Sequence, residues 1–511
     1  MIETNPRLPP APTEAVRRYP ELFAARPPAE RRALAQIKRF MERLVADARF
    51  RAALEEHADH PLRVTRKYGI DVDPLDLLPL WHSAHLRWRK TPRCAESWPL
   101  AALWDAHLDR MITHRGMIRE AGSTQESLPR FHAWRQRQIR RGASELGQSA
   151  DAIVHPVIAY ELSEGCSIGC WFCGISADRF AGHFPYTEDN AALWRGVLEA
   201  AVELFGPAAS TGFCYWATDP MDNPDYDRFI EDHYHITGGL PQTTTAAPMK
   251  DVSLTRRVLA LQRRHPTTIN RFSILSVRIL DRVHAEFDAE ELLEVELIAQ
   301  NRESLARKAS AGRAAERRAK AAARGRGTDG LRLSDLHTTI ACVSGFLVNM
   351  PRRTVRLVSP TAAGGRWPKG YRVYDEARFD SPGEFLECMQ QMVEDYMPEA
   401  VPAQARLGFR EDLGFEGIEG GFVLHGTNAR YTVRSDAFSS ELGALIRMGS
   451  LTSGEIVQRL VAEGADIFVV TRAIQQLFDL GFLNDDPSMD GIAPTPQRGR
   501  LQAVSDVAGA A

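Results

Sequence analysis

Cys166-Ser-Ile-Gly-Cys170-Trp-Phe-Cys173-Gly174 is the stretch on which the interpretation of this 511-residue sequence depends. Its three cysteines, at CxxxCxxC spacing, directly follow an apolar, strand-like run at 153–162. Thiolates select soft metals and iron–sulfur clusters, and a [4Fe–4S] cluster normally takes four cysteine ligands. Three cysteines would leave one iron open to a ligand from outside the protein. The alternatives are three buried free thiols or a zinc knuckle, although a structural zinc needs four ligands and no second CxxC-type pair is present.

Composition and charge narrow the class of protein. The length is that of about three domains, and 44% hydrophobic and 25% charged residues are ordinary for a globular chain. A net charge of −3 provides no whole-chain attraction to nucleic acid or to an anionic membrane. We find no signal peptide and no apolar run of the ~20 residues that cross a bilayer. The seven cysteines, three of them clustered, argue against a secreted disulfide framework. We expect a soluble cytoplasmic protein that binds neither nucleic acid nor membrane.

The chain divides into five predicted regions. A proline-rich segment at 1–30 is expected to be flexible, and a helical domain follows at 31–148. Part of that domain, from Phe40 to Leu80, resembles the Nif11-type module of peptide-precursor leader regions; a helical domain packed on the core is the alternative. An α/β core is expected at 149–400, a recognition module at 401–485 and a disordered tail at 486–511.

The core alternates strands and helices. An amphipathic helix at 193–205 ends at Gly206-Pro207, and strands are predicted at 240–247, 270–278, 338–350 and 354–360. This order implies parallel strands with helical crossovers, and we predict an α/β fold built on a partial parallel (β/α)6 barrel. A basic, alanine-rich insertion at 301–330 interrupts it. We expect a solvated helix there, the alternative being a binding site for an acidic leader peptide or a nucleic acid.

The cysteine run, with Phe172 before its third cysteine and Gly174 after it, resembles the signature of the radical SAM superfamily. The resemblance implies a [4Fe–4S] cluster on Cys166, Cys170 and Cys173, with S-adenosylmethionine (SAM) chelated by the open iron. Reductive cleavage of SAM would then release a 5′-deoxyadenosyl radical.

The same resemblance assigns the SAM contacts. In that superfamily the second strand ends in a Gly-Gly-Glu-Pro run, of which Ala217-Thr218-Asp219-Pro220 resembles a variant with both glycines replaced. Phe172, Ala217, Thr218 and Asp219 would then contact SAM, the last at its ammonium group. Ser276, or else Ser273, would contact the ribose. A plain Asp-Pro turn and a serine bonded to neighbouring backbone are the alternatives.

Two longer stretches, 161–177 and 342–349, resemble the PoyD-like radical SAM epimerases of ribosomal peptides. This implies conversion of L- to D-residues in a precursor peptide, with Cα hydrogen abstraction on one face and hydrogen return from a thiol on the other. By its context Cys342 is assigned as the hydrogen-atom donor, with Cys214 as the alternative donor. Cys388 lies in a predicted amphipathic helix and is explained as a buried core residue. Desaturation, cross-linking and methylation are alternative reactions.

The C-terminal module combines a hairpin at 420–433 with helices at 439–448, 452–463 and 468–480. It resembles winged-helix or PqqD-like elements, which bind a precursor leader by strand addition. DNA binding is disfavoured because two arginines face four acidic residues over 452–480. The expected partners are a precursor peptide, through leader and core, and a low-potential electron donor such as flavodoxin or ferredoxin. A non-catalytic winged-helix protein with a vestigial cluster is the remaining alternative.

Overall fold

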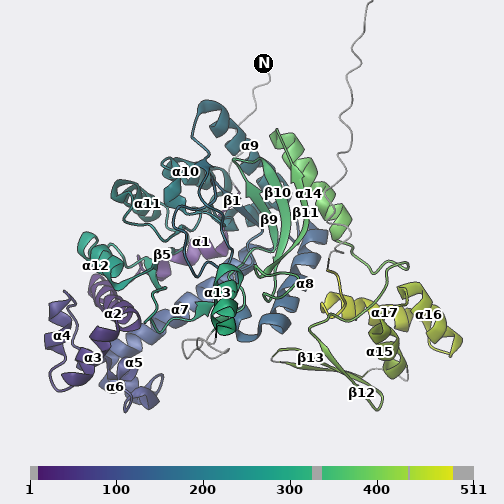
Figure 1. The fold of residues 1–511 in the computed structure, drawn as a ribbon, viewed down its shortest axis with the longest axis horizontal. Coiled ribbons are helices and arrows are strands. Elements are labelled where there is room, and N and C mark those ends of the chain that lie inside the picture. The colour runs from purple at the N-terminus through teal and green to yellow at the C-terminus, as the bar shows by residue number, and fades with distance from the viewer. Residues whose placement is uncertain (1–9, 325–335, 428, 435–437, 487–511) are drawn as a thin grey trace, which may run out of the picture.

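A computed structural model describes residues 10–324, 336–427, 429–434 and 438–486, which form a mixed α/β protein (Figure 1). The predicted tail from 487 onward lies outside the described residues, as do residues 1–9 and the 325–330 portion of the predicted insertion. None of the helices in the described ranges has the length and apolar character needed to cross a bilayer.

The N-terminal helices build a core of their own. The helices of this region are α1 (Glu14–Arg18), α2 (Pro28–Ala46), α3 (Ala48–Glu56), α4 (Leu62–Lys67), α5 (Leu78–Trp81), α6 (Pro92–Ser97) and α7 (Pro99–Ala121). Asp47 separates α2 from α3 because its carboxylate accepts hydrogen bonds from the backbone N–H groups of Arg49 and Phe50, at 2.9 and 3.2 Å. Leu34, Ile37, Phe40, Phe50 and Leu54 are fully buried, as their spacing predicts.

The proline-rich segment differs from the expectation of a flexible lead-in. From residue 10 onward it contains α1 and a following turn, and Tyr19, Leu22 and Phe23 belong to the N-terminal core. Tyr19 also donates a hydrogen bond from its hydroxyl to Glu294, at 3.1 Å. Three large apolar side chains within five residues are enough to hold this segment against the helices.

The central strands form two sheets. The first has the order β1 (Ile158–Glu161), β9 (Gly345–Asn349), β10 (Thr354–Pro360), β11 (Tyr371–Arg378); the second has the order β4 (Thr244–Thr245), β5 (Asn270–Ile274), β6 (Val295–Ala299). β1 and β9 are parallel, as are the strands of the second sheet. Phe213 bridges to β1 through a parallel pair with Ala159. The described strands do not form a closed barrel.

All four predicted core strands differ from the structure, and the strand predicted at 338–350 is reduced to β9, which begins at Gly345. β10 and β11 are antiparallel to their neighbours, because the four residues between β9 and β10 are too few for a parallel crossover. The strand predicted at 240–247 is reduced to β4. The strand predicted at 270–278 ends at Ile274, because Ser276 starts the helix α12 (Val277–Glu286).

Five helices share one core with residues of β1, β9 and β10. They are α8 (Pro129–Leu146), α9 (Glu188–Phe205), α10 (Tyr226–Thr237), α11 (Val252–Arg264) and α14 (Pro382–Tyr396). α8, which the sequence assigned to the N-terminal domain, instead contributes Phe131 and Trp134 to the same core as Phe346 of β9. The domain boundary predicted at 148 therefore falls after a helix that packs with the strands.

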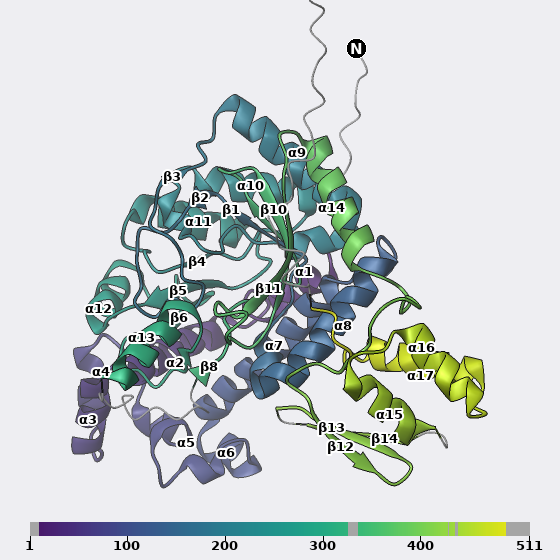
Figure 2. The ribbon, with the colours of Figure 1, turned by 45° about the vertical axis from the view of Figure 1, so that its right-hand side comes forward.

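The C-terminal module contains three strands and three helices and lies beside α8 (Figure 2). The strands β12 (Gly414–Ile418), β13 (Gly421–His425) and β14 (Arg430–Arg434) form one antiparallel sheet, one strand more than the predicted hairpin. The helices α15 (Ser439–Met448), α16 (Ser453–Ala462) and α17 (Ile467–Asp479) follow within a residue or two of their predicted bounds. Thr452 and Glu455 form a capping box at the start of α16.

A buried charge network joins this module to the core. Glu145, at the end of α8, accepts hydrogen bonds from Arg141, at 2.7 Å, and from Arg372 of β11. Arg410, which precedes β12, lies 3.7 Å from the same carboxylate oxygen and donates to the hydroxyl of Ser144 at 2.9 Å. Burial alone would raise the pKa of Glu145, but the three arginines outweigh it and lower the pKa to about 2.

We predict that the Glu145→Gln variant is destabilised by about 3–5 kcal/mol, since three buried guanidinium groups lose their shared counter-charge. Urea unfolding at neutral pH measures this. The control is Glu376→Gln, which removes a more exposed ion pair with Arg356 and should cost under about 1 kcal/mol. In the unsubstituted chain this stabilisation is complete above the ordinary pKa of 4.5 and is lost as the pH falls from there toward 2. Equal costs for the two variants would contradict the prediction.

Candidate active site

The cysteine run lies in a loop that a short two-stranded ladder closes. After β1, the strand β2 (Ser163–Glu164) pairs with β3 (Gly182–His183), and the N–H of Cys166 donates to the carbonyl of Asp178 at 2.9 Å. Gly165 has a φ of +70°, and a Cβ there would lie 2.3 Å from the carbonyl oxygen of Arg179. Only glycine allows this close return of the chain. The loop therefore begins at the carboxyl end of β1.

The three thiols of this cluster loop (residues 165–181) have the donor chemistry of an iron–sulfur site. Each is partly exposed and none is in a disulfide. Burial raises the pKa of Cys166 to about 11 and that of Cys170 to about 12, and the charges of Cys166 and Cys173 add to the rise at Cys170. Cys166 and Cys173 are thus close enough to Cys170 for their charges to act on it, and a cationic cluster would relieve that repulsion. Among the described residues, no group of three or more His, Cys, Asp or Glu side chains is placed so that it could hold a metal ion.

The basic insertion covers the cluster loop. Its helix α13 (Gly312–Ala323) starts against the loop, where the N–H of Arg313 donates to the carbonyl of Cys173 at 3.0 Å. The Arg313 guanidinium donates to the carbonyls of Cys170, at 2.9 Å, and Ala177. The expectation of a purely solvated helix is therefore wrong for this end of α13. Nothing in the local composition distinguishes Arg313 from the other arginines of the insertion.

The Asp219-Pro-Met-Asp222 turn ties the cluster loop to its neighbours. Asp222 accepts hydrogen bonds from the N–H of Ser167, at 2.8 Å, and from Lys250, at 2.5 Å. Asp219 is buried and accepts from the hydroxyl of Thr245, at 2.7 Å, and the N–H of Ala246, also at 2.7 Å. Burial raises the pKa of Asp219. Both of its oxygens thus hold the end of β4, a role that the sequence did not indicate.

The other residues assigned to SAM lie at the same end of the strands, and three of the four have partners within the protein. The N–H of Ala217 donates to the buried carboxylate of Glu161, at 2.9 Å, which also binds the side chain of Asn349. The hydroxyl of Ser276 accepts from the N–H of Ile279 at 3.2 Å and so caps α12. Phe172 packs edge-on against Trp171. The hydroxyl of Thr218 is buried and has no hydrogen-bond partner among the described residues, which leaves it available to a bound molecule.

The thiols of the three other cysteines in this region, Cys214, Cys342 and Cys388, have different surroundings. Along one segment Phe213 and Tyr215 pack with Ala159 and Leu347, whereas Cys214 packs on the opposite side, in the core shared with the helices. Burial raises the pKa of Cys214. Cys342 joins the group of Phe213 and Tyr215. Cys388 lies on α14, where its thiol contacts the carbonyl of Arg378.

Cys342 lies between the cluster loop and the amino end of β9. Ile340 packs against Gly174 of the loop. Its Cγ1 lies so near that a Cβ added to this glycine would be only 2.9 Å away. Two residues later comes Cys342, and β9 begins at Gly345, parallel to β1. Cys173 belongs to the same apolar group as Cys342. The thiol is therefore on the same side of the sheet as the cluster loop, displaced toward the amino ends of the strands.

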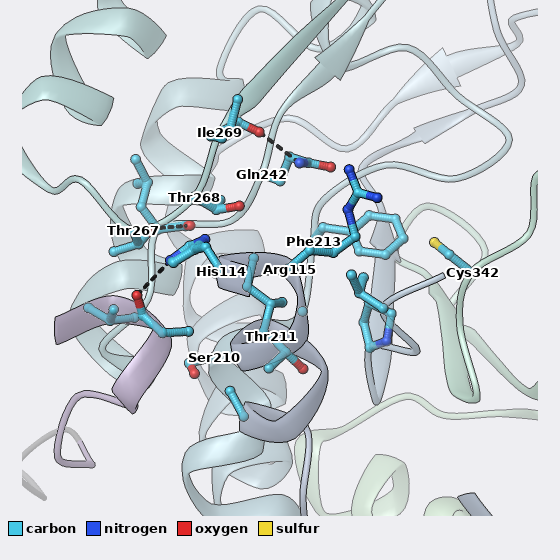
Figure 3. A pocket seen from close by; sticks show the side chains of 18 of the residues that line it. His114, Arg115, Ser210, Thr211, Phe213, Gln242, Thr267, Thr268, Ile269 and Cys342 are labelled. Carbon is cyan, nitrogen blue, oxygen red and sulfur yellow. Dashed lines mark hydrogen bonds between the residues drawn. The ribbon is translucent and has the colours of Figure 1, made fainter. Parts of the chain in front are cut away.

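A cavity of about 130 Å³ lies at those amino ends, and Cys342 forms part of its wall (Figure 3). Its polar side chains are connected: the hydroxyl of Tyr215 donates to Gln242 at 2.9 Å, Arg271 donates to the same oxygen at 3.3 Å, and Arg271 pairs with Glu296 at 2.8 Å. None of these residues was predicted from the sequence to belong to a site. The residues start successive strands, and only knowledge of the strand starts could have brought them together.

Comparisons with known proteins identify the family of the chain. The family model described as the protein y4wI C-terminal domain matches residues 407–481. The chain is 48% identical over 467 residues to the uncharacterized protein y4wI of Sinorhizobium fredii (strain NBRC 101917 / NGR234), covering 91% of this chain and 90% of that protein. It therefore belongs to the y4wI family. A crystal structure of BtrN in complex with AdoMet and 2-DOIA matches 29% of this chain and 57% of BtrN, at 13% identity and a TM-score of 0.22.

We predict that Asp222→Asn destabilises the chain by about 1–3 kcal/mol, because Lys250 and the N–H of Ser167 lose a charged acceptor whose side chain is fully buried. Proteolytic cleavage within 165–181 should accelerate in parallel. The matched control, Asp227→Asn, removes a more exposed pair with Arg257 and should change the stability by less than about 1 kcal/mol. Urea unfolding and timed proteolysis test both. An unchanged cleavage rate in Asp222→Asn would contradict the assignment.

Proposed function

We propose that this member of the y4wI family is a radical SAM enzyme that converts L- to D-residues in a ribosomally made precursor peptide. The observation that carries the proposal is that the three-cysteine loop, at the carboxyl end of β1, and the lone thiol of Cys342, toward the amino ends of the strands, lie on the same side of the sheet. A partial barrel of the radical SAM kind is part of the proposal. It is supported by the parallel order of β4, β5 and β6 and by the bridge from Phe213 to β1.

Cys166, Cys170 and Cys173 would hold a [4Fe–4S] cluster, and the strand ends around Thr218 would receive SAM. When bound, the two groups would supply the 5′-deoxyadenosyl radical that removes a Cα hydrogen. Arg313 fixes the loop through the carbonyls of Cys170 and Ala177, so the thiols are held before any cofactor binds. The unpartnered hydroxyl of Thr218 supports a ligand at this end of the strands.

Cys342 would return the hydrogen. Burial raises the pKa of its thiol to about 12, so the S–H group is intact at neutral pH. Transfer of that hydrogen to a Cα radical forms a C–H bond, breaks the S–H bond and leaves a thiyl radical. One electron from the donor protein and one proton would restore the thiol. Cys214 is less suitable, because it packs in the core shared with the helices rather than beside Phe213 and Tyr215.

The C-terminal module would bind the leader of the precursor. β12 and β14 are the edge strands of its sheet, whereas β13 lies between them and is buried. An exposed strand edge offers backbone groups to an added strand. Arg430 and Arg434 lie on β14 and are exposed; Arg430 pairs with Glu416 of β12 at 3.4 Å, and Arg434 is the cation that favours an acidic leader segment at that edge.

A low-potential electron donor such as flavodoxin or ferredoxin would dock at the cluster loop. Trp171 is partly exposed there, and the guanidinium groups of Arg302 and Arg317 lie 5.6 and 4.9 Å from its ring. An acidic donor would be attracted to these cations, because opposite charges steer association. The cations beside Trp171 therefore support this partner at this surface.

The decisive test is incubation of the chain with peptide, SAM and reductant in D2O. Inversion should add one deuterium to each inverted residue with no other change of mass. Cys342→Ala should still produce 5′-deoxyadenosine but complete no inversion, because the radical is formed and not quenched by a thiol. Cys214→Ala is the matched control and should retain inversion. A mass loss of two hydrogens, a gained methyl group, or an active Cys342→Ala would contradict the epimerase. Absence of 5′-deoxyadenosine would exclude a radical SAM enzyme and favour a binding protein.

We also predict that Arg317→Glu slows cluster reduction by reduced flavodoxin by about three- to tenfold at low salt, because charge reversal weakens electrostatic steering. Reduction by dithionite, followed by the bleaching of the visible absorbance, should be unchanged. Arg459→Glu, an exposed reversal on α16, is the control. Equal slowing with both reductants would place the effect on the cluster rather than on docking.

A further inference from the structure

The cavity beside Cys342 has an excess of positive charge. Arg115 of α7 and Arg271 of β5 line it, and Glu296 of β6 is the carboxylate among the residues that form its wall. His114 also lines it, but burial lowers the pKa of its imidazole, whose Nε2–H donates to the carbonyl of Ala15 at 2.8 Å. The neutral imidazole leaves two cations against one anion.

The two arginines differ in their partners. Arg271 pairs with Glu296 at 2.8 Å and donates to Gln242 at 3.3 Å. The guanidinium of Arg115 makes no hydrogen bond and no ion pair with the described residues, although the charge of Glu296 acts on it and burial lowers its pKa. A guanidinium stays charged in proteins, and a partly buried charge without a hydrogen-bonded partner is costly. Arg115 is thus the group in this wall that a ligand would satisfy.

We propose that this cavity binds a carboxylate of the peptide substrate through Arg115 and so presents the neighbouring residue to Cys342. Figure 3 shows Arg115 extending from α7 toward Gln242, with the sulfur of Cys342 directed toward the same space. A guanidinium and a carboxylate form a bidentate pair of fixed geometry, which would hold the peptide in register. Arg115 is here a substrate-binding residue, and the saturated set of Tyr215, Gln242 and Arg271 shapes the wall behind it.

The carboxylate could belong to an Asp or Glu side chain or to a chain terminus, and both present the same chemistry. The inference rests on the proposed function only in taking the ligand to be a peptide. Its test needs neither the cluster nor SAM, so its failure is distinct from the failure of the epimerase proposal.

The first experiment compares two reagents that alkylate Cys342 in the full-length chain. Iodoacetate carries a carboxylate and iodoacetamide does not, so a carboxylate site beside the thiol should favour iodoacetate. Site-resolved mass spectrometry gives the ratio of the two rates at Cys342, with Cys388 as the internal reference. We expect Arg115→Gln to lower that ratio by about tenfold, the effect of one charge-assisted hydrogen bond, and Arg115→Lys to restore part of it. Arg110→Gln, on an exposed position of the same helix, should leave the ratio unchanged.

An unchanged ratio in Arg115→Gln would overturn the proposal, as would an equal fall in Arg110→Gln. The ratio compares two reagents on the same variant. If a variant unfolds in part and exposes Cys342, both alkylation rates rise, and the faster reaction with iodoacetamide reveals the unfolding.

The second experiment distinguishes the sources of the carboxylate by protection of Cys342 from iodoacetamide. The probes are N-acetyl-Ala-Glu-Ala-amide, N-acetyl-Ala-Gln-Ala with a free carboxyl terminus, and N-acetyl-Ala-Gln-Ala-amide. Protection by the first alone assigns a side-chain carboxylate, and protection by the second alone assigns a chain terminus. Protection by neither, or equal protection by the amide without a carboxylate, would overturn the site.

Discussion

The two carboxylates of the Asp219-Pro-Met-Asp222 turn are the constraint on which the site depends. Asp222 holds the start of the cluster loop and Lys250, and Asp219 holds the end of β4. Both are nearly inaccessible to water, so a donor lost on either side leaves a buried acceptor unsatisfied. The loop after β1 and the chain after β4 therefore take their positions from one turn. Glu161 extends the same arrangement, because it binds both Ala217 and Asn349.

Secondary-structure elements that depend on neighbouring residues could be predicted from the sequence. The helices of the C-terminal module were predicted to within a residue or two, and the structure shows that Thr452 and Glu455 form a capping box at the start of α16. The cysteine spacing and the strand before it likewise located the loop. Elements defined by distant partners were not predictable in this way. Tyr19 is ordered by Glu294 and Arg313 by carbonyls of the cluster loop, and neither partner lies nearby in the sequence.

Period-two alternation explains what the sequence could and could not say about the cysteines. Phe213, Cys214 and Tyr215 lie in extended chain, so the thiol must be on the face opposite the two rings. The sequence does not show which face points toward the site. The structure places both rings with Cys342 and places Cys214 with the helices. The register of β9 on β1 settles the position of Cys342 along the strands, and no local pattern contains that register.

The surroundings of Cys342 also bear on which side chain could give a hydrogen atom to a substrate radical. Tyr215 is the other hydrogen donor in this part of the cavity wall, and burial raises the pKa of its phenol to about 12, so it too is protonated. Its hydroxyl, however, is held by Gln242, which Ile269 and Arg271 hold in turn. The thiol of Cys342 makes no hydrogen bond with the described residues and can turn without breaking one. On the proposed function, the saturated set restrains the phenol, and the thiol is left as the group free to meet the substrate.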